Sequence, residues 1–218
     1  YSYSSNEKKG LSNPVVGRTI EDKDGNLWIG TEGGGLNYYN RRTREFKWYR
    51  PQEGRNSISH NNVKALYYDA DKEIIWIGTH LGGLNKLDIR SGHFTHYRME
   101  EGNPNTLPSD IIRDIIPYKS LLIIATQNGV CLFDPANGQC QQLFKDSKEG
   151  KSIKMVADVT FDSEGTLWIA ATGEGVFSYR FDTCRLTNYR HDATNPNSLS
   201  NNNVNNITQD SKGNLWFS

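Results

Sequence analysis

Apolar and aromatic residues occur along this chain in short runs, which are separated by turns rich in Gly, Asn, Asp and Pro. The runs return at a nearly constant interval, marked by a large apolar residue at Trp28, Trp76, Ile123, Trp168 and Trp216. The successive spacings are 48, 47, 45 and 48 residues. Self-similarity at a fixed interval of this length indicates a repeat architecture, in which each unit buries its apolar face against its neighbours.

Each repeat is expected to contain four strands. In the second repeat they cover residues 63–68, 74–79, 83–88 and 94–98, and all four runs are rich in β-branched and aromatic residues and bounded by turn residues. Four antiparallel strands every 45–48 residues match the blade of a β-propeller. The sequence therefore predicts an all-β fold, a β-propeller of four-stranded antiparallel blades, with the repeated tryptophans in the core between blades.

The chain is predicted to hold four complete repeats and partial ones at both ends. They are placed at about residues 14–59, 60–109, 110–153 and 154–200, with a partial repeat at 201–218 and the tail of a preceding blade with its loop at 1–13. Because the first residue is Tyr and the last repeat is incomplete, we expect a piece of a longer protein with exposed strand edges that seek a partner.

The order of strands sorts the connections onto two faces. If the first strand of each blade is innermost, the long loops between blades and the glycine-rich turns between the second and third strands share one face. Function tends to reside on loops held by a rigid scaffold, and a central opening makes a concave site. We therefore expect a ligand on this face, held by planar amide, carboxylate, imidazole and guanidinium groups. The candidate ligand-binding residues are Arg18, Glu32, His60, Asn61, Asn62, His80, Asp114, Gln127, Asn128, Asp158, Asn202 and Asn206. For each residue the alternative is an ordinary capped turn or a solvated opening.

Catalytic chemistry has little support in the sequence. Glycoside hydrolysis needs two facing carboxylates, and Glu32 with Glu174, or Asp114 with Asp158, occupy equivalent repeat positions. Because repetition alone places equivalent residues on one ring, no catalytic residue is assigned. Two alternatives to a ligand-binding module remain: a propeller enzyme such as a lyase, and a non-catalytic interaction scaffold. No Cys–His cluster has metal-ligand spacing, and neither a metal nor a cofactor is expected.

Charge and cysteine content narrow the possibilities further. The 25 acidic and 25 basic residues give a net charge of zero, which argues against a nucleic-acid groove. Cys131 and Cys140 flank the turn DPANG, and because cross-strand neighbours rarely suit disulfide geometry, we expect free, half-buried thiols.

The sequence motifs NLWIGTEGGGL at residues 26–36 and LSNNNV at residues 199–204 resemble the two-component regulator propeller repeat. That repeat builds the extracytoplasmic sensor region of hybrid two-component receptors of gut bacteria that use polysaccharides. The resemblance implies a sensor module that recognises an oligosaccharide, performs no reaction itself and lies in the periplasm. It also implies a neighbouring propeller or β-domain, a homodimeric parent receptor with a histidine kinase, and membrane attachment only through that parent.

Overall fold

The computed structural model describes residues 1–145, 147, 150 and 153–218. Residues 146, 148–149 and 151–152, which the sequence places at the end of the third repeat, lie outside the described residues. The described part of the chain contains a 3-10 turn, η1 (Glu7–Lys9). The chain forms two compact units. The first contains Tyr1–Glu101 and Ser109–Ile115, and the second contains Gly102–Pro108 and Ile116–Ser218.

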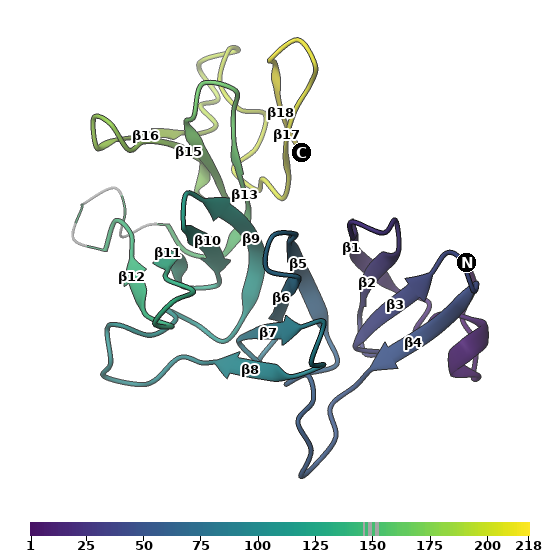
Figure 1. Cartoon of the computed structure of the whole chain (residues 1–218). Helices are drawn as coiled ribbons and strands as arrows, with labels where there is room; N and C mark the ends of the chain where they lie inside the picture. Colours follow the sequence, from purple (N-terminus) through teal and green to yellow (C-terminus); the bar gives the residue numbers. More distant parts are fainter. Residues whose placement is uncertain (146, 148–149, 151–152) are drawn as a thin grey trace. The chain divides into compact units, whose positions relative to one another are not determined.

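The described residues form four four-stranded sheets, each of which follows the order of the chain (Figure 1). The first sheet contains β1 (Val16–Glu21), β2 (Leu27–Thr31), β3 (Leu36–Asn40) and β4 (Glu45–Tyr49). The second contains β5 (Val63–Asp69), β6 (Ile74–Thr79), β7 (Leu84–Asp88) and β8 (Phe94–Tyr97). The third contains β9 (Ile112–Tyr118), β10 (Leu121–Thr126), β11 (Gly129–Phe133) and β12 (Cys140–Gln142). The fourth contains β13 (Val156–Phe161), β14 (Leu167–Ala171), β15 (Gly175–Arg180) and β16 (Arg185–Tyr189), and β17 (Ile207–Gln209) pairs with β18 (Leu215–Phe217). The predicted all-β fold and its four-stranded blades are confirmed, while the exact repeat boundaries stay a prediction.

An aspartate closes the turn between the first two strands of a sheet and binds the repeated tryptophan. In the first sheet, Asp22 accepts hydrogen bonds from the backbone N–H of Asn26 at 2.9 Å and from the indole Nε1 of Trp28 at 3.1 Å. The same bond joins Asp162 to Trp168 at 2.7 Å and Asp210 to Trp216 at 3.1 Å. The six-residue spacing from Asp to Trp in these repeats is therefore the distance that lets one carboxylate hold both the turn and the ring.

Neighbouring sheets bury each other's apolar faces. In the first unit, Trp28 and Leu36 of the first sheet share one cluster with Ile75, Ile77 and Phe94 of the second. In the second unit, Val130 and Ile123 pack with Val159, Ile169 and Phe177 of the next sheet. A lone sheet of this size has no partner for its apolar face, so stacking supplies the core that one blade lacks.

The tryptophans differ in burial. Trp28 and Trp76 are 1% exposed, as the sequence predicts, but Trp168 is only partly buried and Trp216 is 63% exposed. Trp216 lies in the two-stranded sheet, and in the described part of the chain no further sheet packs over its ring. The expectation of a buried indole is therefore wrong for Trp216, because burial comes from the next blade and not from the repeat itself.

The glycine turn of one blade is held by the loop that enters the next. Gly35 has a φ of 80°, and a Cβ there would lie 2.2 Å from the carbonyl oxygen of Tyr49, so a side chain is excluded. The backbone N–H groups of Gly33 and Gly35 donate to the carbonyl oxygen of Asn61, at 3.2 and 2.7 Å. The turn after β2 is thereby fixed to the entrance of β5.

A side chain in the connecting loop also reaches the outermost strand of the next blade. The carboxamide of Asn56 accepts from the backbone N–H of Phe94 at 2.6 Å and donates to its carbonyl oxygen at 2.8 Å. Phe94 begins the edge strand β8, whose outward backbone groups have no strand to pair with. Asn56 thus substitutes for one residue of a missing neighbour and brings the Phe94 ring onto Tyr49, at a centroid distance of 6.0 Å.

Candidate functional site

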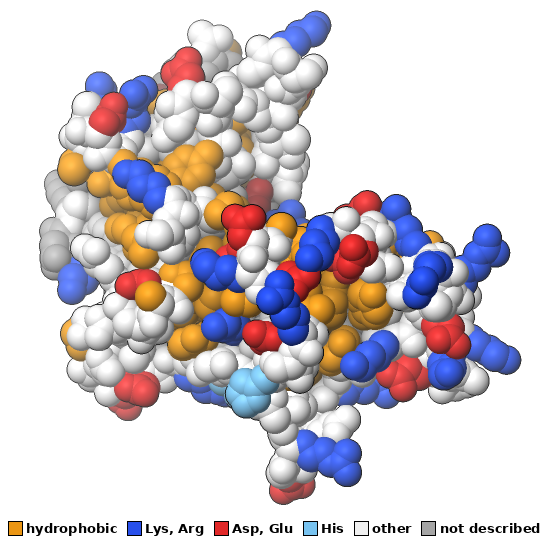
Figure 2. Space-filling model, viewed as in Figure 1, with side chains coloured by type: hydrophobic (Ala, Val, Ile, Leu, Met, Phe, Trp, Pro, Cys, Tyr) orange, Lys and Arg blue, Asp and Glu red, His pale blue; other side chains and the backbone are white. Residues whose placement is uncertain are grey.

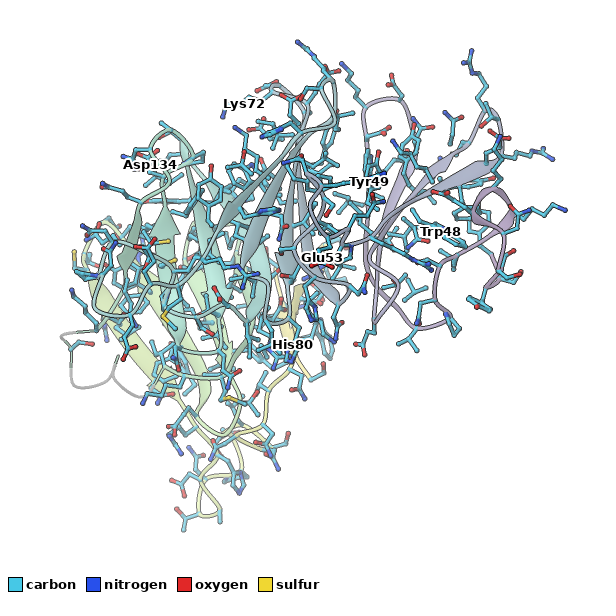
Figure 3. The ribbon with its side chains drawn as sticks, turned by 90° about the horizontal axis from the view of Figure 1, so that it is seen from below. Trp48, Tyr49, Glu53, Lys72, His80 and Asp134 are labelled. Carbon is cyan, nitrogen blue, oxygen red and sulfur yellow. The ribbon has the colours of Figure 1, made fainter. Side chains whose placement is uncertain are left out.

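The glycine turns and the entrance loops lie at the same end of a blade. In the second sheet, Lys72 in the β5–β6 turn and His80 in the β6–β7 turn stand at opposite ends of the strands (Figure 3). The backbone N–H of His80 donates to the carbonyl oxygen of Asn62, just before β5, at 2.9 Å. This end of the first unit, which we call the turn end, is the predicted functional face.

Six polar side chains gather at the turn end of the first unit, and we call them the turn-end cluster. Its members come from the glycine turns, the entrance loops and the starts of the first strands of three successive repeats, and they are Glu32, His60, Asn62, Lys64, His80 and Arg113. Glu32 and Asn62 form an isolated antiparallel bridge, which joins the first glycine turn to the loop before β5. The sequence predicted four of these six residues.

Glu32 is held as a carboxylate. Its side chain forms an ion pair with Lys64, and this hydrogen bond is the main reason why the pKa of Glu32 lies below its usual value. A general acid needs a raised pKa so that it carries a proton near neutral pH. Glu32 is therefore suited to accepting hydrogen bonds and not to donating a proton in catalysis.

His80 has an unsatisfied buried nitrogen. Its Nδ1 atom is inaccessible to solvent and has no hydrogen-bond partner, and the Oδ1 atom of Asn62 is in the same condition. Burial lowers the pKa of His80, and the positive charges of Arg113 and Lys64 lower it further. The imidazole is neutral at pH 7, so it offers one donor and one acceptor. Buried polar atoms without partners cost free energy until a water or a ligand satisfies them.

Lys64 and Arg113 belong to the cluster but were not predicted. The sequence argument selected residues two positions into each first strand, such as Arg18 and Asp114, and left out the position before. In β5 the register shifts between Val63 and Ala65, so strict alternation of the side chains fails there. The position that the sequence argument left out is the second residue of the first strand expected in each repeat. Along the chain this position holds Gly17, Lys64, Arg113, Ala157 and Asn205.

Arg113 carries the cluster's available positive charge. Within the described residues its guanidinium forms no ion pair, whereas Lys64 is neutralised by Glu32. Over much of the visible surface, Lys and Arg side chains stand beside Asp and Glu side chains (Figure 2), as the equal numbers of acids and bases suggest. Other Lys and Arg side chains also lie outside ion pairs, but the guanidinium of Arg113 stands beside a neutral imidazole, and its planar donors suit hydroxyl or carboxylate oxygens of a ligand.

Arg18 and Asp114 contact one another deeper in the first unit. The guanidinium of Arg18 donates to the Asp114 carboxylate at 2.9 Å, and the carboxylate is 5% exposed. Asp114 Oδ1 also accepts the backbone N–H of Ile115 at 2.9 Å. The structure thus brings together two predicted residues from the first and third repeats, 96 residues apart, as a partly buried ion pair.

The predicted residues of the second unit, together with Asn61 of the first, mostly hold backbone. The carbonyl oxygen of Asn202 accepts from Gly173 and Gly175, as that of Asn61 does from its own glycine turn. Asp158 is 6% exposed and accepts the backbone N–H of Ile207 at 2.7 Å. The remaining predicted residues also form hydrogen bonds through their own backbone groups, and these residues are Gln127, Asn128 and Asn206. These bonds match the alternative of ordinary structural turns, and ligand binding by the side chains stays a prediction.

The carboxylates considered for catalysis are all engaged. Glu174 pairs with Arg190, as Glu32 does with Lys64 and Asp114 with Arg18. Within the described residues, no group of three or more His, Cys, Asp or Glu side chains is arranged to hold a metal ion.

Surface hollows occur in the second unit. One of about 420 Å³ is lined by Trp168, Tyr189, Leu199 and Phe217, with Arg190 and three polar side chains of the loop. In the first unit the equivalent surface, formed by Trp28, Tyr49 and Ile58, is covered by Phe94. The hollow is the uncovered face of a blade, and we do not assign it a ligand.

Comparison with known proteins agrees with the fold. Residues 10–33, 57–80 and 198–218 match the family model of the two component regulator propeller. A search of curated proteins finds no match. Among the described residues, no helix is long and apolar enough to cross a membrane.

The solved structures that resemble the chain include an extracellular bacterial domain and a fungal β-propeller. The extracellular domain of a protein assigned as a hybrid two component system from B. thetaiotaomicron is 21% identical, with a TM-score of 0.61 over 96% of this chain and 39% of that one. The β-propeller domain of Cps50 (Swd1) from Myceliophteria thermophila is 12% identical, with a TM-score of 0.62 over 98% of this chain and 64% of that one. The chain spans less than two thirds of either, and at these identities the likeness shows the β-propeller fold.

Proposed function

From the two component regulator propeller repeats that this chain carries, we propose that it is a ligand-sensing segment of the extracytoplasmic region of a hybrid two-component receptor, and that it binds an oligosaccharide at the turn-end cluster. The proposal places the segment in the periplasm and gives it no reaction of its own. Three segments that match the family model, together with the similarity to the extracellular domain of a protein assigned as a hybrid two component system, support the class of protein.

One observation supports the location of the ligand more than any other. The turn-end cluster combines the guanidinium of Arg113, which forms no ion pair within the described residues, with a neutral imidazole at His80. A sugar hydroxyl both donates and accepts, so it matches a neutral imidazole, and planar guanidinium and carboxylate groups bond two neighbouring hydroxyls. The carboxylate of Glu32, kept ionised by Lys64, supplies the acceptor on the other side.

Signalling follows from a difference in affinity between states of the receptor. A ligand shifts an equilibrium only by as much as it binds one arrangement better than another. The cluster joins two glycine turns and two entrance loops, so a bound sugar would tie successive blades together. The parent is proposed to be a homodimer with a histidine kinase, attached to the membrane outside this segment and bearing a neighbouring propeller or β-domain.

The test is calorimetric titration of the chain with a panel of defined polysaccharide fragments, combined with analysis of the same mixtures for products. We expect saturable binding of at least one fragment without turnover. Replacing Arg113 with Ala should weaken that binding about ten-fold or more, as expected when a hydrogen bond to a charged group is lost. Product formation would instead identify an enzyme, and the absence of binding to the whole panel would favour an interaction scaffold.

A matched control is available in the second unit. Glu32→Gln removes the carboxylate of the turn-end cluster, whereas Glu174→Gln makes the same change in the equivalent glycine turn of the fourth repeat. Both glutamates are ion-paired, with Lys64 and Arg190, so the two changes are similar in their structural cost. Only Glu32→Gln should reduce affinity. Equal effects of the two variants would show that the ligand does not lie at the turn-end cluster.

A further inference from the structure

The third repeat replaces two positions of the repeat pattern with cysteine, and the two sulfurs meet. Register places Cys131 opposite Ile124, where the first two blades have Asn37 and Asn85 opposite Ile29 and Ile77. Cys140 pairs with Phe133 and takes the place of Phe46, Phe94 and Leu186 in the other sheets. Two departures from one pattern thus occur at neighbouring positions of the same hairpin.

The sulfur atoms lie close enough to react. The Sγ atoms of Cys131 and Cys140 are 3.3 Å apart, and both side chains are buried, at 0% and 4% exposure. The half-buried state expected from the sequence is therefore wrong for this pair, because both side chains face the interior from the outer half of the blade. A disulfide bond requires about 2.05 Å between the sulfurs, so the atoms must approach by a little over 1 Å.

The edge strand β12 is the less constrained side of this hairpin, while hydrogen bonds keep the two strands in register. Cys140 begins β12, a strand of three residues at the outer edge of the sheet, whereas β11 is held between two strands. The backbone N–H of Cys140 donates to the carbonyl oxygen of Asn105 at 2.7 Å, which keeps the edge strand against the connecting loop. The turn between the strands is closed by Asp134, whose backbone carbonyl accepts from Gly138 at 2.8 Å.

We propose that Cys131 and Cys140 form a disulfide bond that fixes β12 to the third blade when the protein resides in an oxidising compartment. The Cys140 thiolate attacks a small disulfide such as oxidised glutathione, which releases one glutathione thiol and leaves a mixed disulfide on Cys140. The Cys131 thiolate then attacks the Cys140 sulfur and releases the second glutathione thiol. The two cysteines lose two electrons and two protons, and these reappear in the two glutathione thiols.

The pKa of the Cys131 thiol decides when the bond can form. Burial, with the adjacent Cys140 sulfur, holds the pKa of Cys131 well above its usual range, so its thiolate is scarce in the folded state. Closure is therefore favoured during folding, when both thiols are accessible. The oxidising compartment rests on the proposed extracytoplasmic location.

The experiment uses the chain with Cys184→Ser, which removes the exposed third thiol. The protein is refolded from denaturant in a glutathione redox buffer, denatured, alkylated with N-ethylmaleimide and weighed by mass spectrometry. We expect a chain lighter by two hydrogen atoms that takes up no alkyl group, and dithiothreitol treatment before alkylation should restore two alkylation sites. Reduction of the oxidised chain should lower its unfolding temperature by several degrees.

The control is Cys140→Ser in the same background, which should keep one thiol, either free or bound to glutathione. Two alkylated thiols, or glutathione adducts, in the refolded Cys184→Ser chain would overturn the proposal, as would an unfolding temperature that rises on reduction. A negative result in the disulfide experiment would not bear on oligosaccharide binding at the turn-end cluster, because the two experiments change different residues.

Discussion

Replacing Asn56 with Ala tests how a connecting loop holds the next blade. The carboxamide of Asn56 makes two hydrogen bonds with the backbone of Phe94, at 2.6 and 2.8 Å, and the pair is partly buried. Each such bond contributes about 0.5–1.5 kcal/mol net, and water can partly satisfy the freed groups at an edge strand. We expect Asn56→Ala to lower the free energy of unfolding by about 1–2 kcal/mol.

The chain offers its own control for this change. Asn197 occupies the equivalent position in the fourth repeat, in the same Asn-Ser context before an aliphatic residue. Its side chain is exposed, and within the described residues its carboxamide bonds to nothing. Asn197→Ala should therefore change stability by less than about 0.5 kcal/mol. Asn56→Asp keeps the acceptor for the Phe94 N–H but loses the donor, so its stability should fall between wild type and Asn56→Ala.

The assay is equilibrium unfolding in urea, followed by tryptophan fluorescence, with thermal unfolding as a second probe. For a chain of this size, about 1–2 kcal/mol corresponds to a fall in melting temperature of about 2–8 °C. If Asn56→Ala and Asn197→Ala lose equal stability, the loss does not come from the Phe94 contact. An unchanged midpoint for Asn56→Ala would show that the loop does not hold β8 at all.

Three further predictions concern the repeat itself. Asp22→Ala removes the acceptor of the Trp28 indole N–H and of the Asn26 backbone N–H, and should lower the free energy of unfolding in urea by about 2–4 kcal/mol. Asp24→Ala, in the same turn but exposed, should lower it by less than about 0.5 kcal/mol. Similar losses in the two variants would contradict the role of Asp22. Hydrogen bonds from Asn214 and then Trp216 lower the pKa of Asp210 to about 2. Since this folded-state pKa lies below the unfolded value of about 3.9, the stabilisation is present above about pH 4 and is lost as pH falls towards 2; an NMR titration of the carboxyl that gives a midpoint near the unfolded value would refute it. Gly35→Ala should lower the free energy of unfolding by about 2–5 kcal/mol, because the added Cβ would lie 2.2 Å from the Tyr49 carbonyl oxygen. Gly54→Ala, with a φ of 69° and no atom within 4 Å of the added Cβ, should lower it by only about 1 kcal/mol. Equal losses in thermal unfolding followed by circular dichroism would show that the close approach is not the cause.

Local patterns were enough to predict the strands and turns. The second repeat was placed within one residue at every strand end, because alternating apolar residues and glycine or aspartate turns are properties of neighbours in sequence. For the same reason Asp22, Asp162 and Asp210 stand six residues before their tryptophans in each case. A repeat also fixes which loops share an end of the blade, so Glu32, His60, Asn62 and His80 were assigned to one face before any coordinates.

Contacts between repeats decided the rest. Trp28 and Trp216 sit in nearly the same local sequence, yet one is buried and the other is exposed, since burial depends on whether another sheet covers the ring. Lys64 was missed because the sequence argument compared only the next position of each first strand, and the register of β5 shifts between Val63 and Ala65. Cys131 and Cys140 were known to flank one turn, but only the register of β11 on β12 brings their sulfurs together. The sequence by itself determined the blade, because its strands and turns follow from adjacent residues, whereas burial, side-chain direction and pairing depend on which distant residues pack against it.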